Sequence, residues 1–454
     1  MAHPRGGAGT RLLNRDFVLL WQGQLVSQLG NQAFALAMMY WTMQVTGSAR
    51  LMGLLMALTL LPGVVLAPLG GALADRHSRR GLILGGDLIR GLGMLALAGL
   101  MLTRPDAERE IIVALATVAF LGGVVSAWFQ PAIAAAIPDL VPAHRIAAAN
   151  SLHQFSVQGS AFVGQAAGGL LYAALGAPLL FLIDGVTYLF SAASEAFIRL
   201  PQDRRTADTR GLSAYWRDTL DGVRFLRGRS GMAPFLGLAA AINFFAMPVI
   251  LLLPFYASGV LGAGARWYGF LLAAIGAGAV AGYLAAAALP IPPRRRPAVF
   301  VAAVAGTGAS IVAAGQVREP LAALVLFFAV GALTGLVNIT VLTLFQAGTP
   351  GPMRGRVMAL VIALSGAAAP LGMAVGGVVG DATGKDIPLV YGAAGGAIGL
   401  LALTATGLRS VRAFLALDPA PHPGDAPREG TTPVPGGAEP LRWRDDDGRA
   451  DDGA

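Results

Sequence analysis

The chain has 454 residues, of which 55% are hydrophobic and 13% are charged, and its net charge is +8 at pH 7. A soluble globular domain carries about 25% charged residues, so this composition excludes an ordinary soluble protein and predicts an all-α polytopic membrane protein. The basic excess lies in short loops, which is typical of membrane topology rather than nucleic-acid binding, and the absence of cysteine excludes disulfides and thiolate chemistry.

Twelve apolar runs are long enough to cross a bilayer as helices, which takes about 20 residues. They are separated by charged or Pro/Gly-rich breaks. The predicted spans are 16–45, 50–74, 80–103, 110–137, 146–174, 177–199, 232–261, 266–290, 297–316, 320–346, 356–380 and 387–408.

The spans divide into two pseudo-symmetric six-helix bundles, because a short motif recurs at a similar place in each half. The stretch Arg50-Leu51-Met52-Gly53 returns as Arg266-Trp267-Tyr268-Gly269. Internal repeats of this kind are common in transporters, although chance recurrence in a Gly/Ala-rich chain is an alternative. We expect an N-terminal segment over 1–15 and bundles over 16–199 and 232–409.

The segments outside the bundles have their own composition. Residues 200–231 predict a cytoplasmic linker with an amphipathic helix, since Leu212, Trp216 and Leu220 recur every four residues between charged ones. Residues 410–454 are rich in proline, glycine and aspartate, which predicts a disordered cytoplasmic tail.

Arginine is concentrated in alternate loops, which predicts the orientation. With a cytoplasmic N-terminus, the inside loops hold Arg76, Arg79, Arg80, Arg145, Arg294, Arg295, Arg296, Arg354 and Arg356, and the outside loops hold fewer basic residues beside acidic ones. The positive-inside rule therefore predicts that both termini are cytoplasmic.

The loop after the second span carries an unusual combination of a glycine, one acid and three arginines, namely Gly71, Asp75, Arg76, Arg79 and Arg80. An ordinary positive-inside turn needs only the arginines, whereas an acid after a closely packed glycine indicates a gate. The spacing G-x-x-x-D-R-x-x-R-R resembles the signature loop between helices 2 and 3 of the major facilitator superfamily, with Ser78 in place of a glycine. The resemblance implies a cytoplasmic gate. The equivalent loop of the second half, at 294–296, has no acid, so we expect the charged lock on one side only.

Glycines in the fifth and eleventh spans predict close helix packing. In the fifth span, Gly164, Gly168 and Gly169 resemble the antiporter motif of the same superfamily, G-P-x-x-G-G-x-L, although Gln165 replaces the proline. The eleventh span carries a comparable set, namely Pro370, Gly372, Gly376 and Gly377. Generic glycine packing in membrane helices is the alternative interpretation.

Further stretches resemble the twelve-helix drug-exporter branch of the superfamily, which includes macrolide-efflux-like and enterobactin-exporter-like proteins. They are Trp21-Gln22-Gly23-Gln24, Gln130-Pro131-Ala132-Ile133 and Arg354-Gly355-Arg356-Val357. The resemblance covers about residues 10–412. It implies export of hydrophobic drugs, antibiotics or siderophores, with protons as the coupling ion. Together with the residues described below, we expect a monomer in the bacterial cell inner membrane that carries a hydrophobic or amphipathic compound.

Amide and aromatic side chains within the spans are candidates for a substrate cavity, because polar groups in a membrane interior are costly. They lie on the first, fifth, seventh and tenth spans, and the candidates are Gln28, Asn31, Gln32, Gln154, Gln158, Asn243, Phe244, Asn338 and Thr343. Hydrogen bonding between helices is the alternative for each of them.

Three ionisable residues within spans are candidates for proton coupling. Asp184 has no obvious local partner, and an isolated carboxylate in a span can take part in a proton relay. Asp87 and Arg90 stand three residues apart and can also simply pair with each other. The superfamily's helix-4 arginine has no counterpart, because 111–137 hold no charged residue.

Nothing in the sequence indicates an enzyme, a cofactor or a metal site. There is no G-x-x-x-x-G-K-[ST], H-E-x-x-H or G-x-S-x-G motif, and the five histidines have no metal-binding spacing. The sequence predicts a secondary active transporter of a small molecule by alternating access. A lipid or lysophospholipid transporter of the same fold and a non-transporting scaffold or sensor are the alternatives.

Overall fold

The computed structural model describes residues 12–200, 212–289 and 291–417, apart from some side chains within helices, namely those of Pro68, Ala72, Ala74, Asp75, Arg76, residues 212–216, Asp218 and Pro352. Residue contacts divide the chain into Met1–Leu417 and Asp418–Ala454. All of the helices described below belong to the first unit.

The N-terminal half consists of long helices joined by short turns. They are α1 (Arg15–Thr46), α2 (Ala49–Arg76), α3 (Arg79–Thr103), α4 (Glu108–Leu140) and α5 (Ile146–Glu195), with one 3-10 turn, η1 (Ala143–Arg145). Capping side chains set the first three starts, since Asn14, Ser48 and Ser78 each accept a hydrogen bond from a backbone N–H in the first turn of the following helix.

α5 contains two spans, because its backbone breaks at Gly176. This residue has φ 73° and ψ 175°, a conformation that glycine adopts far more readily than other residues. Pro178 lies at the start of the second segment, where its missing N–H costs no helical hydrogen bond. The break falls between the predicted spans 146–174 and 177–199.

The C-terminal half follows the linker helix α6 (Leu212–Gly228). It consists of α7 (Met232–Leu251), α8 (Leu253–Phe255), a π-helical turn η2 (Tyr256–Val260), α9 (Ala265–Ala288), α10 (Arg296–Gln316), α11 (Pro320–Ala347), α12 (Gly351–Ala382), α13 (Ile387–Gly407) and α14 (Arg409–Leu415).

Ten helices in the described ranges are long and apolar enough to cross a membrane, against twelve predicted spans, and the difference has two causes. One of the ten covers Ala143–Glu195 and includes the broken α5, which holds two spans. The other cause is α1, which is 32 residues long but carries five amide side chains between positions 22 and 32 that lower its mean hydropathy. The predicted fold class, an all-α membrane protein of two six-helix bundles, is confirmed.

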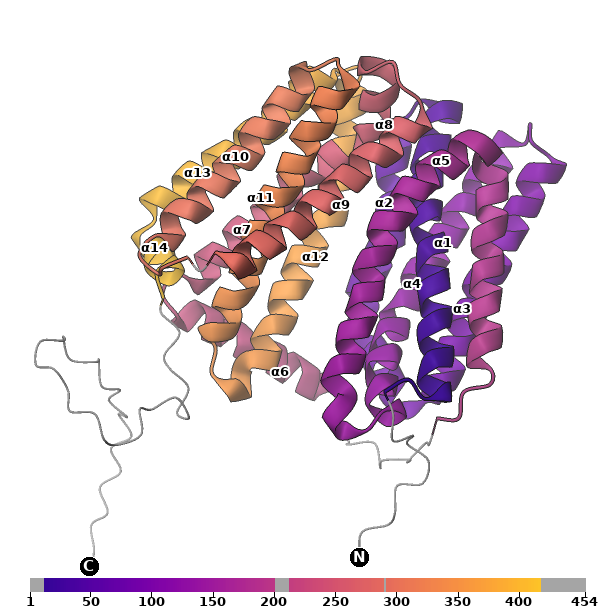
Figure 1. Cartoon of the computed structure of the whole chain (residues 1–454), viewed down its shortest axis with the longest axis horizontal. Coiled ribbons are helices and arrows are strands. Elements are labelled where there is room, and N and C mark those ends of the chain that lie inside the picture. Colours follow the sequence, from indigo (N-terminus) through magenta and orange to yellow (C-terminus); the bar gives the residue numbers. More distant parts are fainter. Residues whose placement is uncertain (1–11, 201–211, 290, 418–454) are drawn as a thin grey trace, which may run out of the picture. The chain divides into compact units, whose positions relative to one another are not determined.

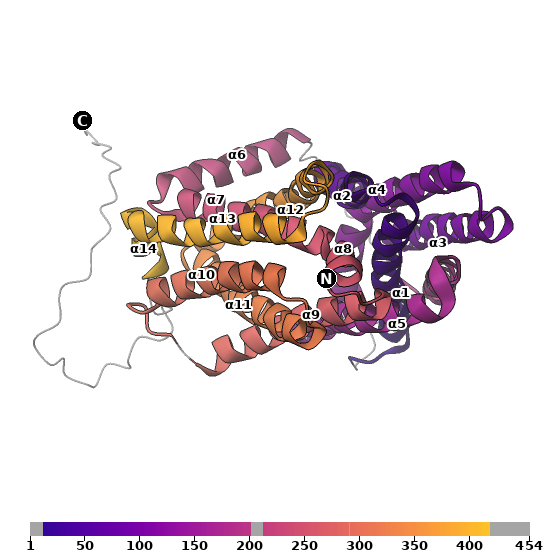
Figure 2. The ribbon, with the colours of Figure 1, turned by 90° about the horizontal axis from the view of Figure 1, so that it is seen from above.

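The two halves lie side by side when the molecule is seen along its spans (Figure 2). In Figure 1, α1 begins at what we call the lower end, and α1 ends and α2 begins at the upper end. The ribbons of the two halves converge at the upper end and separate toward the lower end, where α6 lies (Figure 1). The main contacts between the halves join α2 to α12 and α5 to α9.

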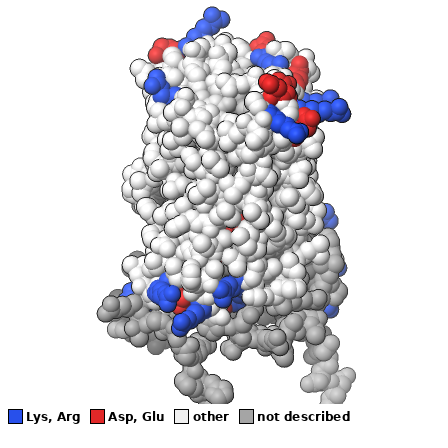
Figure 3. Space-filling model, turned by 90° about the vertical axis from the view of Figure 1, so that its right-hand side faces the viewer, with Lys and Arg blue, Asp and Glu red and all other residues white. Residues whose placement is uncertain are grey.

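Charged side chains gather at the two ends of the N-terminal half and leave the band between them largely uncharged (Figure 3). Many large apolar side chains in this band are exposed, including Leu92, Val113 and Val186. Such a surface is costly in water and suits a lipid environment. The protein is therefore a multi-pass membrane protein.

The ordered chain extends beyond the predicted start of the tail. Residues Arg409–Leu415 form α14, where a disordered tail was expected from 410 onward. The reason is an apolar face, because Phe414 packs against Phe235 and Phe345 with ring centroids 5.4 and 5.5 Å apart. The remainder of the predicted tail, from 418 onward, lies outside the described residues, as do residues 201–211 of the linker.

Candidate functional site

Amide side chains lie in the middle part of four helices, within about two helical turns of one another in depth. Asn31 in α1, Gln158 in α5, Asn243 in α7 and Asn338 in α11 lie 16, 12, 11 and 9 residues from the lower ends of their helices. At 1.5 Å per residue this corresponds to roughly 14–24 Å, near the middle of a span. We call these four residues the amide layer.

The amide layer has no hydrogen-bond partner within the described part of the chain, and neither do Gln28 and Gln154 beside it. Asn31, Gln158 and Asn338 are also exposed, and Asn243 is half-buried. An amide that is left unpaired in an apolar medium costs several kcal/mol, on the order of 2–7. Hydrogen bonding between helices is not seen for these side chains among the described residues, and their place in a substrate cavity stays a prediction.

Other amides of α1 do follow the alternative interpretation. Gln32 accepts a hydrogen bond of 3.5 Å from Gln165 in α5. Gln24 is 2% exposed and donates a bond of 2.7 Å to Glu195. Gln24, which shares the helix face of Gln28 and Asn31 in sequence, thus points into the N-terminal half and not into a cavity.

The remaining cavity candidates lie on the C-terminal half. Thr343 in α11 is exposed, and Phe244 in α7 is half-buried with its ring 5.3 Å from that of Phe245 in an edge-to-face arrangement. Among the described residues, the contacts bring Gln32 and Gln165 together but do not join the candidates of α7 and α11 to those of α1 and α5. The candidates of the N-terminal half and those of the C-terminal half share only their position near the middle of their helices.

Three carboxyl groups are buried inside the N-terminal half. Asp87 in α3 and Asp184 in α5 are 0% exposed, and Glu195 at the end of α5 is 1% exposed. Glu195 accepts hydrogen bonds from Gln24 and, at 3.3 Å, from Ser191. Four of the six carboxyl oxygens, both of Asp87 and one each of the others, have no hydrogen-bond partner among the described residues.

Arg90 is the cation nearest to these acids, and the simple pair with Asp87 does not form. The described residues contain no ion pair between Arg90 and Asp87 within 4.0 Å, although the two interact electrostatically. The Arg90 guanidinium lies instead over the ring of Phe129, 4.5 Å from its centroid, and 5.8 Å from that of Tyr188. The Arg90 guanidinium thus interacts electrostatically with all three buried carboxyl groups.

Asp184 lies against α1 close to the amide layer. A Cβ added to Gly30 would lie 2.4 Å from the Asp184 Oδ1 atom, so a larger residue at position 30 would require this carboxyl group to move. Asn31 is the next residue along α1 and points to the exposed side. The buried carboxyl group of Asp184 and the exposed amide of Asn31 therefore lie on different sides of α1.

The loop predicted as a gate makes its described contacts within its own half. Arg79 forms an ion pair with Asp139 at the end of α4, and Arg80 donates to the Ala196 carbonyl oxygen. The side chains of Asp75 and Arg76 lie outside the described residues. The described arginines of this loop thus hold the lower end of the N-terminal half together.

The glycine of this loop differs from the expectation of close packing. A Cβ on Gly71 would meet no described atom within 4 Å, whereas one on Gly70 would lie 2.0 Å from the Ala127 carbonyl oxygen in α4. The physical reason is the separation of the two halves at the lower end, which leaves Gly71 without a neighbouring helix. Gly70 packs within its own half.

The glycines of the fifth and eleventh spans lie at helix crossings. Gly164 and Gly168 of α5 face α1, and Gly169 faces Gly269 of α9, whose Cα would lie 2.8 Å from an added Cβ. In α12, Gly372 and Gly376 face α7 and Gly377 faces α2. Pro370 is buried inside α12.

Two residues of interest were not among the sequence candidates. Glu195 completes the buried acid cluster, and its sequence signal is an acid in an apolar run four residues after Ser191. Asp381 joins the two halves at the upper end, where its carboxylate accepts three hydrogen bonds from residues around the start of α2. Its signal is the stretch Gly-Gly-x-x-x-Asp at 376–381, which repeats that at 70–75.

Comparison with known proteins agrees with this architecture. The model of the family described as Major Facilitator Superfamily matches residues 20–364. A solved structure of a D-xylose–proton symporter superposes on 88% of this chain and 98% of that chain, with a TM-score of 0.64 and 14% sequence identity. At this identity the likeness concerns the fold alone.

Sequence relatives include exporters. Macrolide efflux protein A of Streptococcus pyogenes is 28% identical over 242 residues, which are 52% of this chain and 58% of that protein, so the match spans little more than half of the relative. The uncharacterised MFS-type transporter YfiS of Bacillus subtilis is 27% identical over 420 residues, 88% of this chain and 95% of that one.

Proposed function

The chain belongs to the Major Facilitator Superfamily, and on this basis we propose that it is a secondary active transporter that exports a hydrophobic or amphipathic small molecule from the cytoplasm. The observation that carries this proposal is the amide layer, whose side chains have no hydrogen-bond partner among the described residues at mid-span. The similarity to a macrolide efflux protein supports the choice of an amphipathic cargo.

The chemistry of the layer suits a large ligand with scattered polar groups. Each amide offers two donors and one acceptor oxygen, and Phe244 adds an aromatic surface on α7. A ligand with hydroxyl, amine or lactone groups on an apolar body satisfies these amides and shields the apolar wall. The halves are joined at the upper end, so the ligand enters at the lower end, which we take as cytoplasmic from the arginine distribution.

We propose that protons drive export through the buried acid cluster. If Asp87, Asp184 and Glu195 were all ionised, the charge of Arg90 would leave two negative charges uncompensated in a buried site, which is costly. Proton binding removes that cost, and release of a proton returns it. Asp184 is the member that transmits the change to the ligand side, since it touches α1 at Gly30 beside Asn31.

Everted membrane vesicles that contain the protein test this function. An imposed proton gradient should drive uptake of at least one compound from a panel of macrolides, other amphipathic antibiotics and siderophores, and a protonophore should abolish it. Absence of gradient-dependent uptake across the panel, with folded protein in the membrane, contradicts the proposal. Uptake of lysophospholipid alone would instead identify a lipid transporter.

A matched pair of variants on α11 tests the amide layer. Asn338→Ala removes one layer amide and should lower uptake about five- to tenfold, the effect of losing about one hydrogen bond to the ligand. Gln346→Ala removes an exposed amide at the lower end of the same helix and should leave uptake within about twofold. If the two variants lowered uptake equally, the amide layer would not be part of the ligand site.

A further inference from the structure

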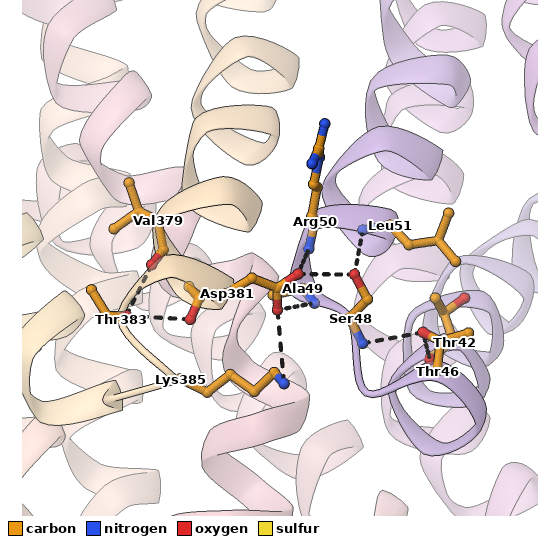
Figure 4. Close-up of polar contacts among 11 residues, drawn as sticks. Thr42, Thr46, Ser48, Ala49, Arg50, Leu51, Val379, Asp381, Thr383 and Lys385 are labelled. Atoms are coloured by element: carbon orange, nitrogen blue, oxygen red, sulfur yellow. Dashed lines mark hydrogen bonds and ion pairs between the residues drawn. The ribbon is translucent and has the colours of Figure 1, made fainter.

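A single carboxylate ties the two halves together at the upper end. Asp381, next to last in α12, accepts hydrogen bonds of 2.9 Å from the backbone N–H groups of Ala49 and Arg50 and from the Ser48 hydroxyl (Figure 4). Lys385 lies 3.8 Å from the same carboxylate, and the Arg50 side chain points away from it (Figure 4).

These bonds supply what the start of α2 lacks. The first N–H groups of a helix have no partner within the helix, and the Ser48 hydroxyl accepts only that of Leu51, at 3.1 Å. Asp381 accepts the N–H groups of the two preceding residues, Ala49 and Arg50. A residue of the C-terminal half therefore completes the cap of a helix of the N-terminal half. A carboxylate is favoured at this position because the helix N-terminus carries a partial positive charge.

Small residues bring the two helices close enough for this contact. A Cβ on Gly377 would lie 2.4 Å from the Ala49 carbonyl oxygen, and one on Gly53 would lie 2.6 Å from the Met373 carbonyl oxygen. The pairing of 49 with 377 and of 53 with 373 shows that α2 and α12 run antiparallel. Their backbones touch along the stretch that ends at Asp381.

The antiparallel pair carries the same short pattern at both of its C-terminal ends. Residues 70–75 of α2 and 376–381 of α12 both read Gly-Gly-x-x-x-Asp, and each aspartate is the next to last residue of its helix. In α12 the second glycine, Gly377, packs on α2, whereas a Cβ on its counterpart Gly71 would meet no described atom within 4 Å. The second glycine of the pattern therefore lies at a close helix contact at one end of the pair, and has open space around its Cβ position at the other.

We propose that Asp381 is a gating residue of the upper end, whose carboxylate holds the start of α2 when that end is closed and releases it when the protein opens there. The contact is the counterpart, on the opposite face of the membrane, of the gate expected at Asp75. Breaking it exposes the Ala49 and Arg50 N–H groups to water. The proposal depends on alternation between two states and not on which compound is carried.

Other contacts at the upper end limit the size of the effect. The Tyr40 hydroxyl lies 3.0 Å from that of Ser258, its ring stacks on that of Tyr268, and Gly169 packs on Gly269. Asp381→Asn removes the charge and keeps one acceptor oxygen, so the upper end should open more often without falling apart. We expect the ratio of upper-open to upper-closed protein to rise about tenfold.

Spin-label distances measure this ratio directly, and the absence of cysteine makes labelling clean. One pair of cysteines at Arg104 and Arg318 reports on the upper end, and a second pair at His144 and Arg295 reports on the lower end; all four positions are exposed. In liposomes without substrate, Asp381→Asn should increase the fraction of molecules that show the longer distance between the upper labels. It should also increase the fraction that show the shorter distance between the lower labels.

Asp386→Asn is the matched control. Asp386 also caps a helix, accepting a bond of 3.0 Å from the Leu389 N–H, but donor and acceptor both belong to the C-terminal half. This variant should leave both distance distributions unchanged. Ser48→Ala removes the hydroxyl that donates to Asp381 and should produce a smaller shift in the same direction.

Two outcomes would overturn the proposal. One is an Asp381→Asn protein that is folded and monodisperse and has the distance distributions of the parent. The other is a shift of the same size in Asp386→Asn, which would indicate a general effect of losing a charge near this loop. Because no substrate is present, failure of the export proposal leaves this test intact.

Discussion

Replacing Gly377 by alanine should open the upper end through a steric clash, while the residue at position 381 stays aspartate. The added Cβ would lie 2.4 Å from the Ala49 carbonyl oxygen and 3.1 Å from the Arg50 Cα. Carbon–oxygen contacts between helices lie at about 3.3–3.6 Å, so α2 must move away from α12 by roughly 1 Å. That movement lengthens the 2.9 Å bonds of Asp381 to roughly 3.9 Å, beyond hydrogen-bond range.

The cost falls on the upper-closed state alone, because the two helices are already apart when that end is open. Overpacking of this kind costs about 1–3 kcal/mol, which shifts a two-state ratio by about 5- to 150-fold. Met373 faces α2 at this crossing and is 5% exposed. The rate at which a hydrophilic thiol reagent labels Met373→Cys should therefore rise at least about fivefold in the Gly377→Ala background.

Gly366→Ala provides the control on the same helix. A Cβ at Gly366 would meet no described atom within 4 Å, and the substitution adds the same methyl group and the same gain in helix propensity. Labelling of Met373→Cys should stay at its original rate in this background. Identical labelling in both backgrounds, with both proteins folded, would refute the claim that close approach at Gly377 keeps the upper end shut.

Two further predictions concern the N-terminal half. Gly70→Ala should lower the melting temperature of the purified protein by several degrees, because its Cβ would overlap the Ala127 carbonyl oxygen at a cost of about 1–3 kcal/mol. Gly71→Ala, whose added Cβ would meet no described atom, should leave the melting temperature unchanged. Equal melting temperatures of these two variants would refute the close packing at Gly70. Glu195→Gln should lower gradient-driven uptake at least about tenfold while substrate exchange without a gradient persists. Loss of both activities together would indicate that Glu195 is structural through its bond to Gln24.

The helices were predictable from the sequence, because apolar length alone defines a membrane span. The starts of α2, α3 and α10 lie within one residue of the predicted spans. The start of α12 lies five residues before its predicted span, since Gly351 and Arg354 look like loop residues in sequence. α14 was missed because Phe414 is buried by residues from α7 and α11, which no local pattern reveals.

The candidate site was predictable as a set of residue types but not as a set of partners. Gln28 and Gln32 stand one turn apart on α1, yet only Gln32 meets an amide of α5. Likewise, the spacing of Asp87 and Arg90 suggested a pair, but the rings of Phe129 and Tyr188 draw the guanidinium elsewhere. Which polar groups remain free for a ligand depends on contacts between helices, and a single sequence does not encode these contacts locally.

The position of Asp381 also bears on how a transporter keeps its two states close in free energy. At the upper end, Ser48 and Asp381 together accept the first three N–H groups of α2. At the lower end, the start of α12 has no cap from a described side chain. If Asp75 takes that place when the lower end closes, each state satisfies one helix start and gives up the other. Such an exchange would bring the free energies of the two states closer together, so that a modest difference in ligand or proton affinity could shift the population.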